Sequence, residues 1–183
     1  MVKYSVMLRV IFLMLFTVST LASQSSESFE RVLQLEGFRS LPYDDATGKT
    51  LTKCQIISGD YKGKPHIGYG TVIPKHWFNK EWVYRGVSKT FARNLAKQHP
   101  IRKLVSREVL KVKIKLSQDQ EDVLHEAGYN LGHLVIRKLV KTINTKGVNA
   151  AADRLLLYTK SNGKTLKGLV KRRKQEAKRL RGK

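Results

Sequence analysis

Glu36-Gly37-Phe38-Arg39 and His66-Ile67-Gly68-Tyr69-Gly70 are the two stretches that decide the fold. The first closes an apolar stripe with helical spacing, and its glycine is a residue type that commonly ends helices. The second is a short apolar run bracketed by glycines, as expected of a strand that bends or lies close to another group. The sequence therefore predicts a helix that runs directly into a small sheet.

Two carboxylates belong to this junction. Glu36 lies at the expected helix end, where burial would favour its neutral form. Asp45 lies in a polar turn, where a carboxylate can stay hydrated and charged. Cleavage of a glycosidic bond uses such a pair: one carboxyl donates a proton, and the other carboxylate directs water or attacks the sugar. Asp44 is a rival for the second role, because either aspartate could instead cap the backbone of the turn.

The remaining sequence outlines an α+β fold. The segment from Tyr43 to Ile73 predicts a small antiparallel sheet, and the chain turns helical after Pro74. We therefore expect a small β-containing N-terminal lobe, a larger helical C-terminal lobe, and a cleft between them that could hold a polysaccharide. The expected helices are Ser25 to Glu36 with Ser26 as its N-cap, Ser88 to Gln98, one opened by Pro100, Ser117 to Leu131, Leu134 to Asn144, Val148 to Thr159 and Thr165 to Arg181.

Four groups of residues, in order along the chain, resemble the phage-type lysozymes (the endolysins and muramidases of glycoside hydrolase family 24). They share the order and residue types of that family's active-site helix end, strand and helices. They are Glu36-Gly37-Phe38-Arg39 with Tyr43 and Asp45, Ile67-Gly68-Tyr69-Gly70, Leu116 to Gln120 with Ala127 to Gly132, and Gly168 to Arg173 with Glu176.

This resemblance implies a lysozyme-like catalytic domain over residues 25–183. It implies Glu36 and Asp45 as catalytic residues, since the family's spacing favours Asp45 over Asp44. Tyr43, Gly68, Tyr69 and Asn130 are expected to contact the substrate, with the glycines allowing a close approach of the backbone. A packing role is expected for Arg173.

His66 departs from the family pattern. The family usually has threonine before Ile-Gly-Tyr-Gly, and Thr71 stands where a histidine often follows. Thr50 or Thr52 could take the threonine's role but lack the Ile-Gly sequel, so we assign the position to His66 and include it among the catalytic candidates. Its imidazole could activate water, attack the sugar, or only support Asp45. The residues from Lys49 to Pro65 form an insertion that is expected to extend a hairpin.

The charge of the chain is strongly positive, at +22, and basic residues crowd its C-terminus. Such a charge favours polyanionic partners. No nucleic-acid recognition motif is present and no aromatic residues alternate with the basic run, so we expect an anionic envelope surface and no specific nucleic acid.

The N-terminus has the features of an export signal. A basic start, an uncharged run from Val10 to Ala22 and small residues at its end are typical of a signal peptide, and a transient signal-anchor is the alternative for residues 1–22. Cys54 is the single cysteine, so no intramolecular disulfide can form, and we expect a plain free thiol.

These observations predict an exported, monomeric muramidase that acts on peptidoglycan in the periplasm or outside the cell. No cofactor is expected, because acid, base and water suffice. No metal site is expected either, because His125, Glu126 and His133 lack the His-Glu-x-x-His spacing of zinc enzymes. A lytic transglycosylase, which needs no second carboxylate, and a non-catalytic cationic envelope-binding protein are the alternatives.

Overall fold

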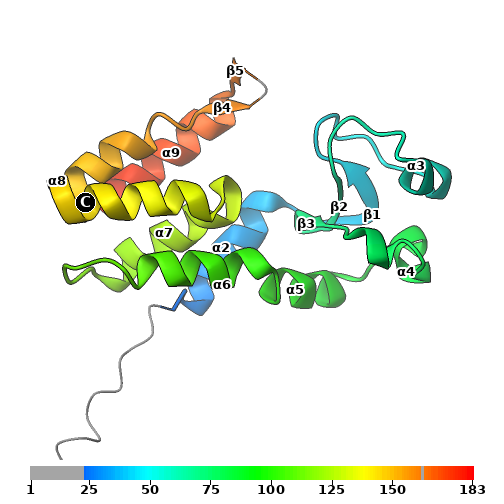
Figure 1. The fold of residues 1–183 in the computed structure, drawn as a ribbon, viewed down its shortest axis with the longest axis horizontal. Coiled ribbons are helices and arrows are strands. Elements are labelled where there is room, and N and C mark those ends of the chain that lie inside the picture. Colours follow the sequence, from blue (N-terminus) through cyan, green and yellow to red (C-terminus); the bar gives the residue numbers. More distant parts are fainter. Residues whose placement is uncertain (1–22, 162) are drawn as a thin grey trace, which may run out of the picture.

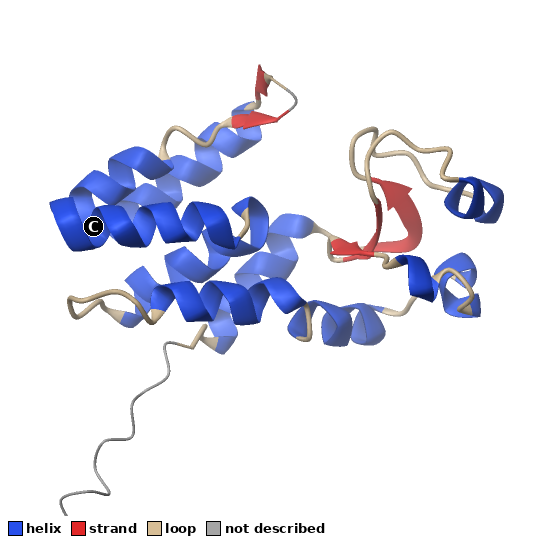
Figure 2. Cartoon of the chain, in the orientation of Figure 1, coloured by secondary structure: helices blue, strands red, loops and turns tan. Residues whose placement is uncertain are grey.

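The computed structural model describes residues 23–161 and 163–183, so the predicted export signal lies outside the described residues. A group of packed helices lies at one end of the molecule and a small sheet with short helices lies at the other (Figure 1, Figure 2). The predicted α+β class and the division into two lobes are confirmed. No helix in these two described ranges combines the length and the apolar character that a membrane span requires.

Helix α2 (Ser26–Glu36) carries the predicted carboxylate at its last position. Its N-cap is Ser25, one residue before the predicted cap, and the Ser25 hydroxyl accepts a hydrogen bond from the Ser28 amide at 3.1 Å. The buried Asp122 accepts hydrogen bonds from the Ser25 amide at 2.8 Å and from its hydroxyl at 2.5 Å. The start of α2 is thereby attached to the helical lobe, and its far end points toward the sheet (Figure 1).

The sheet has the predicted antiparallel pairing. Its strands are β1 (Arg39–Asp44), β2 (Pro65–Gly68) and β3 (Thr71–Val72), in the spatial order β1-β2-β3. Tyr43 pairs with His66 across β1 and β2, and the register shifts between Arg39 and Tyr43. This register sets the predicted active-site residues of the two strands opposite one another.

The insertion between β1 and β2 contains a helix, which corrects the prediction of an extended hairpin. Helix α3 (Lys53–Ser58) begins at Thr52, whose side chain forms a capping box with Gln55. It ends at Gly59 in the left-handed conformation, and Ile56 is completely buried in the core of this lobe. Thr52 and Gln55 were the sequence signal for this helix.

The helical segments after β3 follow most of the predicted boundaries. Ser88 caps α5 and Pro100 opens α6, as predicted, and Ser117 caps α7 with Gln120 completing a capping box. The two helices predicted on either side of Gly147 are present as the two parts of α8, which are separated by the non-helical backbone of that glycine (φ 82°, ψ 174°). The elements are η1 (Lys75–Trp77), α4 (Glu81–Arg85), α5 (Lys89–Lys97), α6 (Pro100–Val109), α7 (Gln118–Leu131), α8 (His133–Leu155), β4 (Lys160–Ser161), β5 (Lys164–Thr165) and α9 (Lys167–Leu180).

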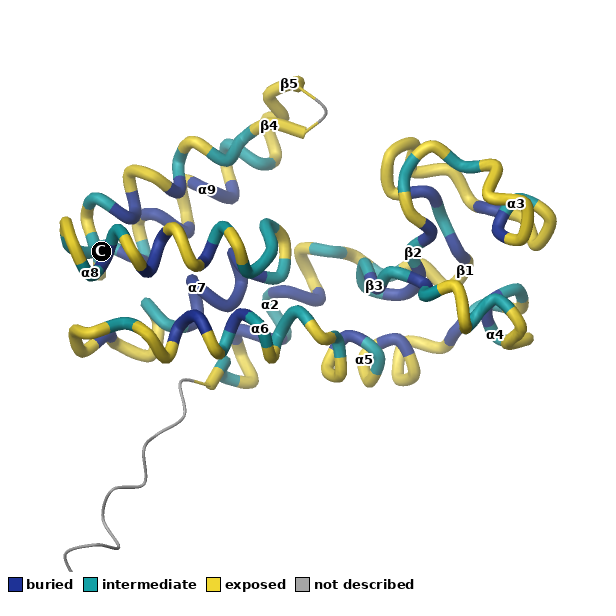
Figure 3. Tube along the Cα trace, in the orientation of Figure 1, coloured by how far each residue is buried: buried dark blue, intermediate teal, exposed yellow. Residues whose placement is uncertain are grey.

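Each lobe has its own apolar core (Figure 3). The larger core joins α6, α7, α8 and α9, and the smaller one packs α3, the sheet, α4 and α5 together. A third cluster, formed by Phe29, Leu33 and Ala96 with Tyr69 and Tyr129 against it, lies where α2 meets α5 and α7. This third cluster supports the junction at which the candidate active-site residues gather.

Candidate active site

Glu36 lies between α9 and the turn that joins β2 to β3. Gly37 ends the helix with φ 68°, and its amide donates to the Leu33 carbonyl. The Glu36 side chain is 20% exposed, and its Oε1 lies 3.1 Å from Nη1 of Arg172. Its Oε2 lies 3.4 Å from the position that a Cβ at Gly70 would occupy. Gly70 therefore leaves room beside the carboxylate.

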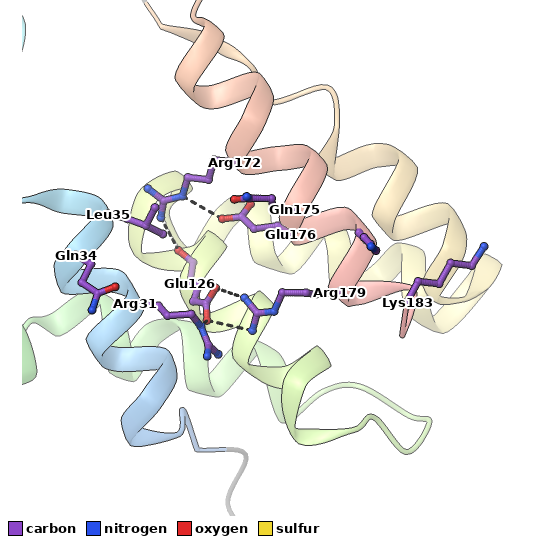
Figure 4. Close-up of a pocket in the computed structure, with 10 residues that line it drawn as sticks. Arg31, Gln34, Leu35, Glu126, Arg172, Gln175, Glu176, Arg179 and Lys183 are labelled. Carbon is purple, nitrogen blue, oxygen red and sulfur yellow. Dashed lines mark hydrogen bonds and ion pairs between the residues drawn. The ribbon is translucent and has the colours of Figure 1, made fainter.

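Arg172 was not predicted as a site residue. Its Nε donates to Glu176 at 3.0 Å and its Nη2 donates to the Glu126 carbonyl at 3.3 Å, so the guanidinium that faces Glu36 is held from both α9 and α7 (Figure 4). The i to i+4 spacing of Arg172 and Glu176 could have indicated the pair. Only the long-range contact with Glu36, which α9 makes through the fold, could not be derived from spacing.

Arg173 is packed in the interior, as predicted, and it forms a hydrogen bond with Asn130. It is completely buried, and its guanidinium donates to Glu176 and to Oδ1 of Asn130. Burial lowers the pKa of Arg173, and burial raises the pKa of Glu176. Asn130 thus helps to hold α7 against α9, and its contact with substrate stays a prediction.

The two neighbouring aspartates have different surroundings. Asp44 is buried and accepts hydrogen bonds from Ala46, Thr47, Lys62 and Gly63 at 2.9–3.1 Å. Burial alone would raise the pKa of Asp44, but these hydrogen bonds outweigh it and the pKa lies below its ordinary value. Asp44 is therefore the aspartate that organises the turn.

Asp45 keeps part of its carboxylate open to solvent, since 43% of its side chain is exposed. Its Oδ1 accepts from the Lys64 amide at 2.5 Å, and its Oδ2 lies 3.9 Å from Nδ1 of His66. The second distance is too long for a hydrogen bond. His66 Nδ1 is instead 3.0 Å from the Lys64 carbonyl, which can only accept, so Nδ1 carries a proton. In neutral His66 the lone pair is then on Nε2.

The backbone of Lys64 thus orients both catalytic candidates. Its amide donates a hydrogen bond to Asp45, and its carbonyl accepts one from His66. This shared attachment was not predicted. Every residue except proline has the same backbone amide and carbonyl, so the residue type at position 64 could not indicate these contacts.

Tyr43 lies beside the imidazole of His66. Its ring centroid is 5.8 Å from that of His66, and the guanidinium carbon of Arg39 lies over the ring, 4.5 Å from its centroid. Burial raises the pKa of Tyr43 first, Arg39 lowers it, and the negative charges of Glu36 and Asp45 both raise it. Tyr43 therefore lies next to His66 and within electrostatic range of both carboxyl groups.

Tyr129 is a second tyrosine near Glu36, and it was not predicted. Burial, followed by the charge of Glu36, raises the pKa of Tyr129, and its hydroxyl donates to the Tyr69 carbonyl at 3.0 Å. His99, whose ring is 5.7 Å from that of Tyr129, has a pKa lowered by burial and by the charge of His66. Tyr129 lies in the Ala127 to Gly132 segment that resembles the family, and His99 directly precedes Pro100, but neither residue type at these positions indicated a place near Glu36.

Gly68 and Tyr69 have packing functions. Gly68 is buried with φ 67°, and a Cβ there would lie 2.7 Å from the Cβ of Ala92 on α5. The Tyr69 ring is 5.5 Å from Phe38, and its carbonyl binds Tyr129. Packing alone therefore accounts for the presence of a glycine at position 68 and a tyrosine at position 69. The contacts of both residues with substrate, and the cleft between the lobes, stay predictions.

Two of the rejected zinc-site residues, His125 and Glu126, are buried, and His133 is half-buried at the start of α8. Glu126 is almost completely buried between Arg31 at 2.9 Å and Arg179 at 2.6 Å. Among the residues described, no group of three or more His, Cys, Asp or Glu side chains is arranged to hold a metal ion. Cys54 is an exposed free thiol on α3.

Known proteins are similar to this chain in sequence and in fold. The chain is 31% identical over 118 residues to an endolysin of Bacillus phage B103, an alignment that covers 63% of this chain and 44% of that endolysin. The fold is similar to the muramidase domain of SpmX from Asticaccaulis excentricus, with a TM-score of 0.62, 23% identity and coverage of 86% of this chain and 97% of that one. It is also similar to the endolysin from Escherichia coli O157:H7 phage FAHEc1, with a TM-score of 0.60, 19% identity and coverage of 86% and 92%.

The family comparison covers the junction and both lobes. The phage lysozyme family model matches residues 33–176, which include Glu36, the paired strands, Arg172 and Glu176. Since this match extends over most of the chain, the chain belongs to the phage lysozyme family.

Proposed function

We propose that the chain is a muramidase that hydrolyses the β-1,4 bond between N-acetylmuramic acid and N-acetylglucosamine in peptidoglycan and so lyses the bacterial wall. Membership of the phage lysozyme family and similarity to an endolysin and a muramidase domain support this proposal. The observation that carries it is that Glu36 lies beside Gly70 and Asp45 is bound by the Lys64 amide, so that two carboxyl groups from different elements lie near the two ends of β2. This reaction needs two carboxyl groups at one site.

Glu36 is the proposed general acid. It comes from a helix end and is the less exposed of the two carboxyl groups, at 20% against 43% for Asp45. In this reaction the acid donates its proton to the leaving oxygen, and the second, more exposed carboxyl group, Asp45, acts as the carboxylate. Arg172 positions the Glu36 carboxylate and stabilises the negative charge that remains after proton transfer.

His66 is proposed to act through Nε2, because Nδ1 is bound to the Lys64 carbonyl. Nε2 could take a proton from the attacking water, which inverts the anomeric configuration. It could also attack the anomeric carbon, forming a glycosyl-imidazolium that water then hydrolyses with overall retention. NMR of the anomer first released from a defined fragment separates the two: an initial α product excludes attack by His66, and an initial β product excludes water activation.

The reaction itself is tested by the products released from purified peptidoglycan. Hydrolysis releases ordinary reducing ends, whereas a lytic transglycosylase would release 1,6-anhydro ends. A non-catalytic cationic protein would release neither. Mass spectrometry of the soluble fragments distinguishes these outcomes, and anhydro ends as the main product would overturn the proposal in favour of the transglycosylase.

The site of action is proposed to be the cell envelope, reached by export and with the chain as a monomer. The positive charge of the chain supports attraction to anionic envelope surfaces. Fractionation of cells that express the full chain tests the export: enzyme found only in the cytoplasm would contradict it.

A further inference from the structure

The arginines at the end of the chain have partners. Arg172 binds Glu36 and Glu176, and Arg173 binds Glu176. Arg179 lies 2.5 Å from Asp119, and Arg181 pairs with Asp153. These side chains attach α9 to the rest of the helical lobe, so the basic C-terminal helix is not uniformly free to bind other molecules.

The lysines of α9 differ from its arginines. All four are exposed, and no ion pair of theirs is found within the described ranges. Their spacing of three to four residues places them along one side of the helix. They are Lys167, Lys171, Lys174 and Lys178.

Three of these lysines line a groove of about 420 Å³ beside the β4–β5 hairpin. Its lining contains no acidic residue and no aromatic residue: Thr165, Lys167, Val170, Lys171, Lys174 and Gln175. Figure 1 places α9 and this hairpin along the edge of the helical lobe, where a long polymer could pass. We call these six residues the lysine groove.

A second cavity that α9 lines shows the contrast. It measures about 540 Å³ and faces α2 and α7, and its arginines lie against Glu126 and Glu176 (Figure 4). Arg31 and Arg179 also have Asp119 nearby, at 4.0 Å and 2.5 Å. The arginines of that cavity are therefore paired with acids, although Lys178 and Lys183, which also line it, have no ion pair among the described residues. The lysine groove, by contrast, contains three lysines and no acid at all.

We propose that the lysine groove binds a phosphate-bearing polymer of the bacterial envelope. The choice of an envelope polymer rests on the proposed function, while the polyanionic character of the ligand rests on the groove. Lys167 and Lys174 are separated by about 10 Å along the helix, a length over which a polymer with repeated charges meets all three ammonium groups. Lysine is a flexible point charge that needs no fixed geometry in its ligand, which suits a repeating chain. Without aromatic residues the groove has no surface for stacking nucleic-acid bases.

The test compares two triple variants of the full chain with the same loss of charge. K167Q/K171Q/K174Q removes the groove, and K138Q/K141Q/K146Q removes three exposed lysines of α8 that line a different cavity, which also contains Asp153. Long-chain polyphosphate is the defined probe, and purified walls with and without their phosphate polymers are the second. Binding is measured at several salt concentrations, and reducing-end release is measured on phosphate-free walls at high salt.

We expect the groove variant to bind polyphosphate at least ~10-fold more weakly than the original chain. The slope of log affinity against log salt should fall by about 2 to 3, because three charge contacts are lost. The α8 variant should bind nearly normally, and both variants should hydrolyse phosphate-free walls at the normal rate. Equal losses in the two variants, or no loss in either, would overturn the groove as the site.

Two further outcomes have separate meanings. Tighter binding of duplex DNA with the same number of phosphates, lost in the groove variant, would overturn the envelope polymer as the ligand. A chain that binds polyphosphate through the groove but releases no reducing ends from any wall would overturn the proposed hydrolase and leave polyanion binding in place.

Discussion

The two carboxylate oxygens of Glu36 have different surroundings. Arg172 lies against one carboxylate oxygen, while Gly70 leaves space beside the other. Glu36→Gln keeps the size of the side chain and removes the donatable proton, so we expect release of reducing ends to fall at least ~100-fold with an unchanged melting temperature. Near-normal clearing of purified walls by this variant would show that Glu36 is not the acid.

The two neighbouring aspartates provide a matched pair of variants. Asp45→Asn should abolish most activity and leave stability almost unchanged, because its carboxylate is partly exposed and has one backbone donor. Asp44→Asn should lower the melting temperature more than Asp45→Asn, since an amide nitrogen would face donors from Thr47 and the backbone. A larger loss of activity at constant stability in Asp44→Asn would reverse our assignment.

Asp44 also predicts a pH dependence. Its folded pKa is lowered, so its contribution to stability is present above the unfolded pKa of about 3.9 and is lost as the pH falls toward the folded value. The difference in melting temperature between the original chain and Asp44→Asn should therefore be constant near neutral pH and shrink below about pH 4. A difference that grows on acidification would contradict this account.

At the scale of elements, the inserted loop fixes the turn that carries the catalytic candidates. A Cβ on Gly63 would overlap Oδ1 of Asp45 and would lie 2.6 Å from Asp44 Oδ1 and 2.7 Å from the Ala46 amide nitrogen. Gly63→Ala must therefore displace the loop or the turn, and we expect a loss of activity of at least ~10-fold, the scale of about 1.4 kcal/mol in the barrier.

Gly168→Ala is the control for this substitution. Gly168 lies within α9 with nothing near its missing side chain, so alanine there should leave activity unchanged and stabilise the helix by up to about 1 kcal/mol. Chemical denaturation and reducing-end release measure both effects. Full activity in Gly63→Ala would mean that the loop does not hold Asp45.

The sequence predicted those elements whose signals are local. Ser88, Pro100 and Ser117 each begin a helix as predicted, because caps act on the nearest backbone amides. The same reasoning should have found α3 from Thr52 and Gln55, but the insertion was treated as an extension of the hairpin. The break predicted near Gly147 is also present, because the backbone of this glycine is not helical.

At the scale of the molecule, the sequence predicted two lobes and placed the active site at their junction, but it could not assign the charges. Arg179 and Arg181 were counted with the free cations of the C-terminus, whereas the structure pairs both with acids from other helices. Likewise Arg172 contacts Glu36 across 136 positions of the chain. Such ion pairs form between helices that are far apart in the sequence. The spacing of residues within each helix does not show which side chains of two helices will meet.

The attachment of Asp45 and His66 to position 64 has a consequence for mutational scanning. Only the amide and carbonyl of Lys64 are used, and its side chain is exposed, so Lys64→Ala should be as active as the original chain. Lys64→Pro removes the amide hydrogen and should be severely impaired in kcat. An alanine scan would therefore class position 64 as dispensable, although two catalytic candidates depend on its backbone. Related sequences could have any residue there except proline.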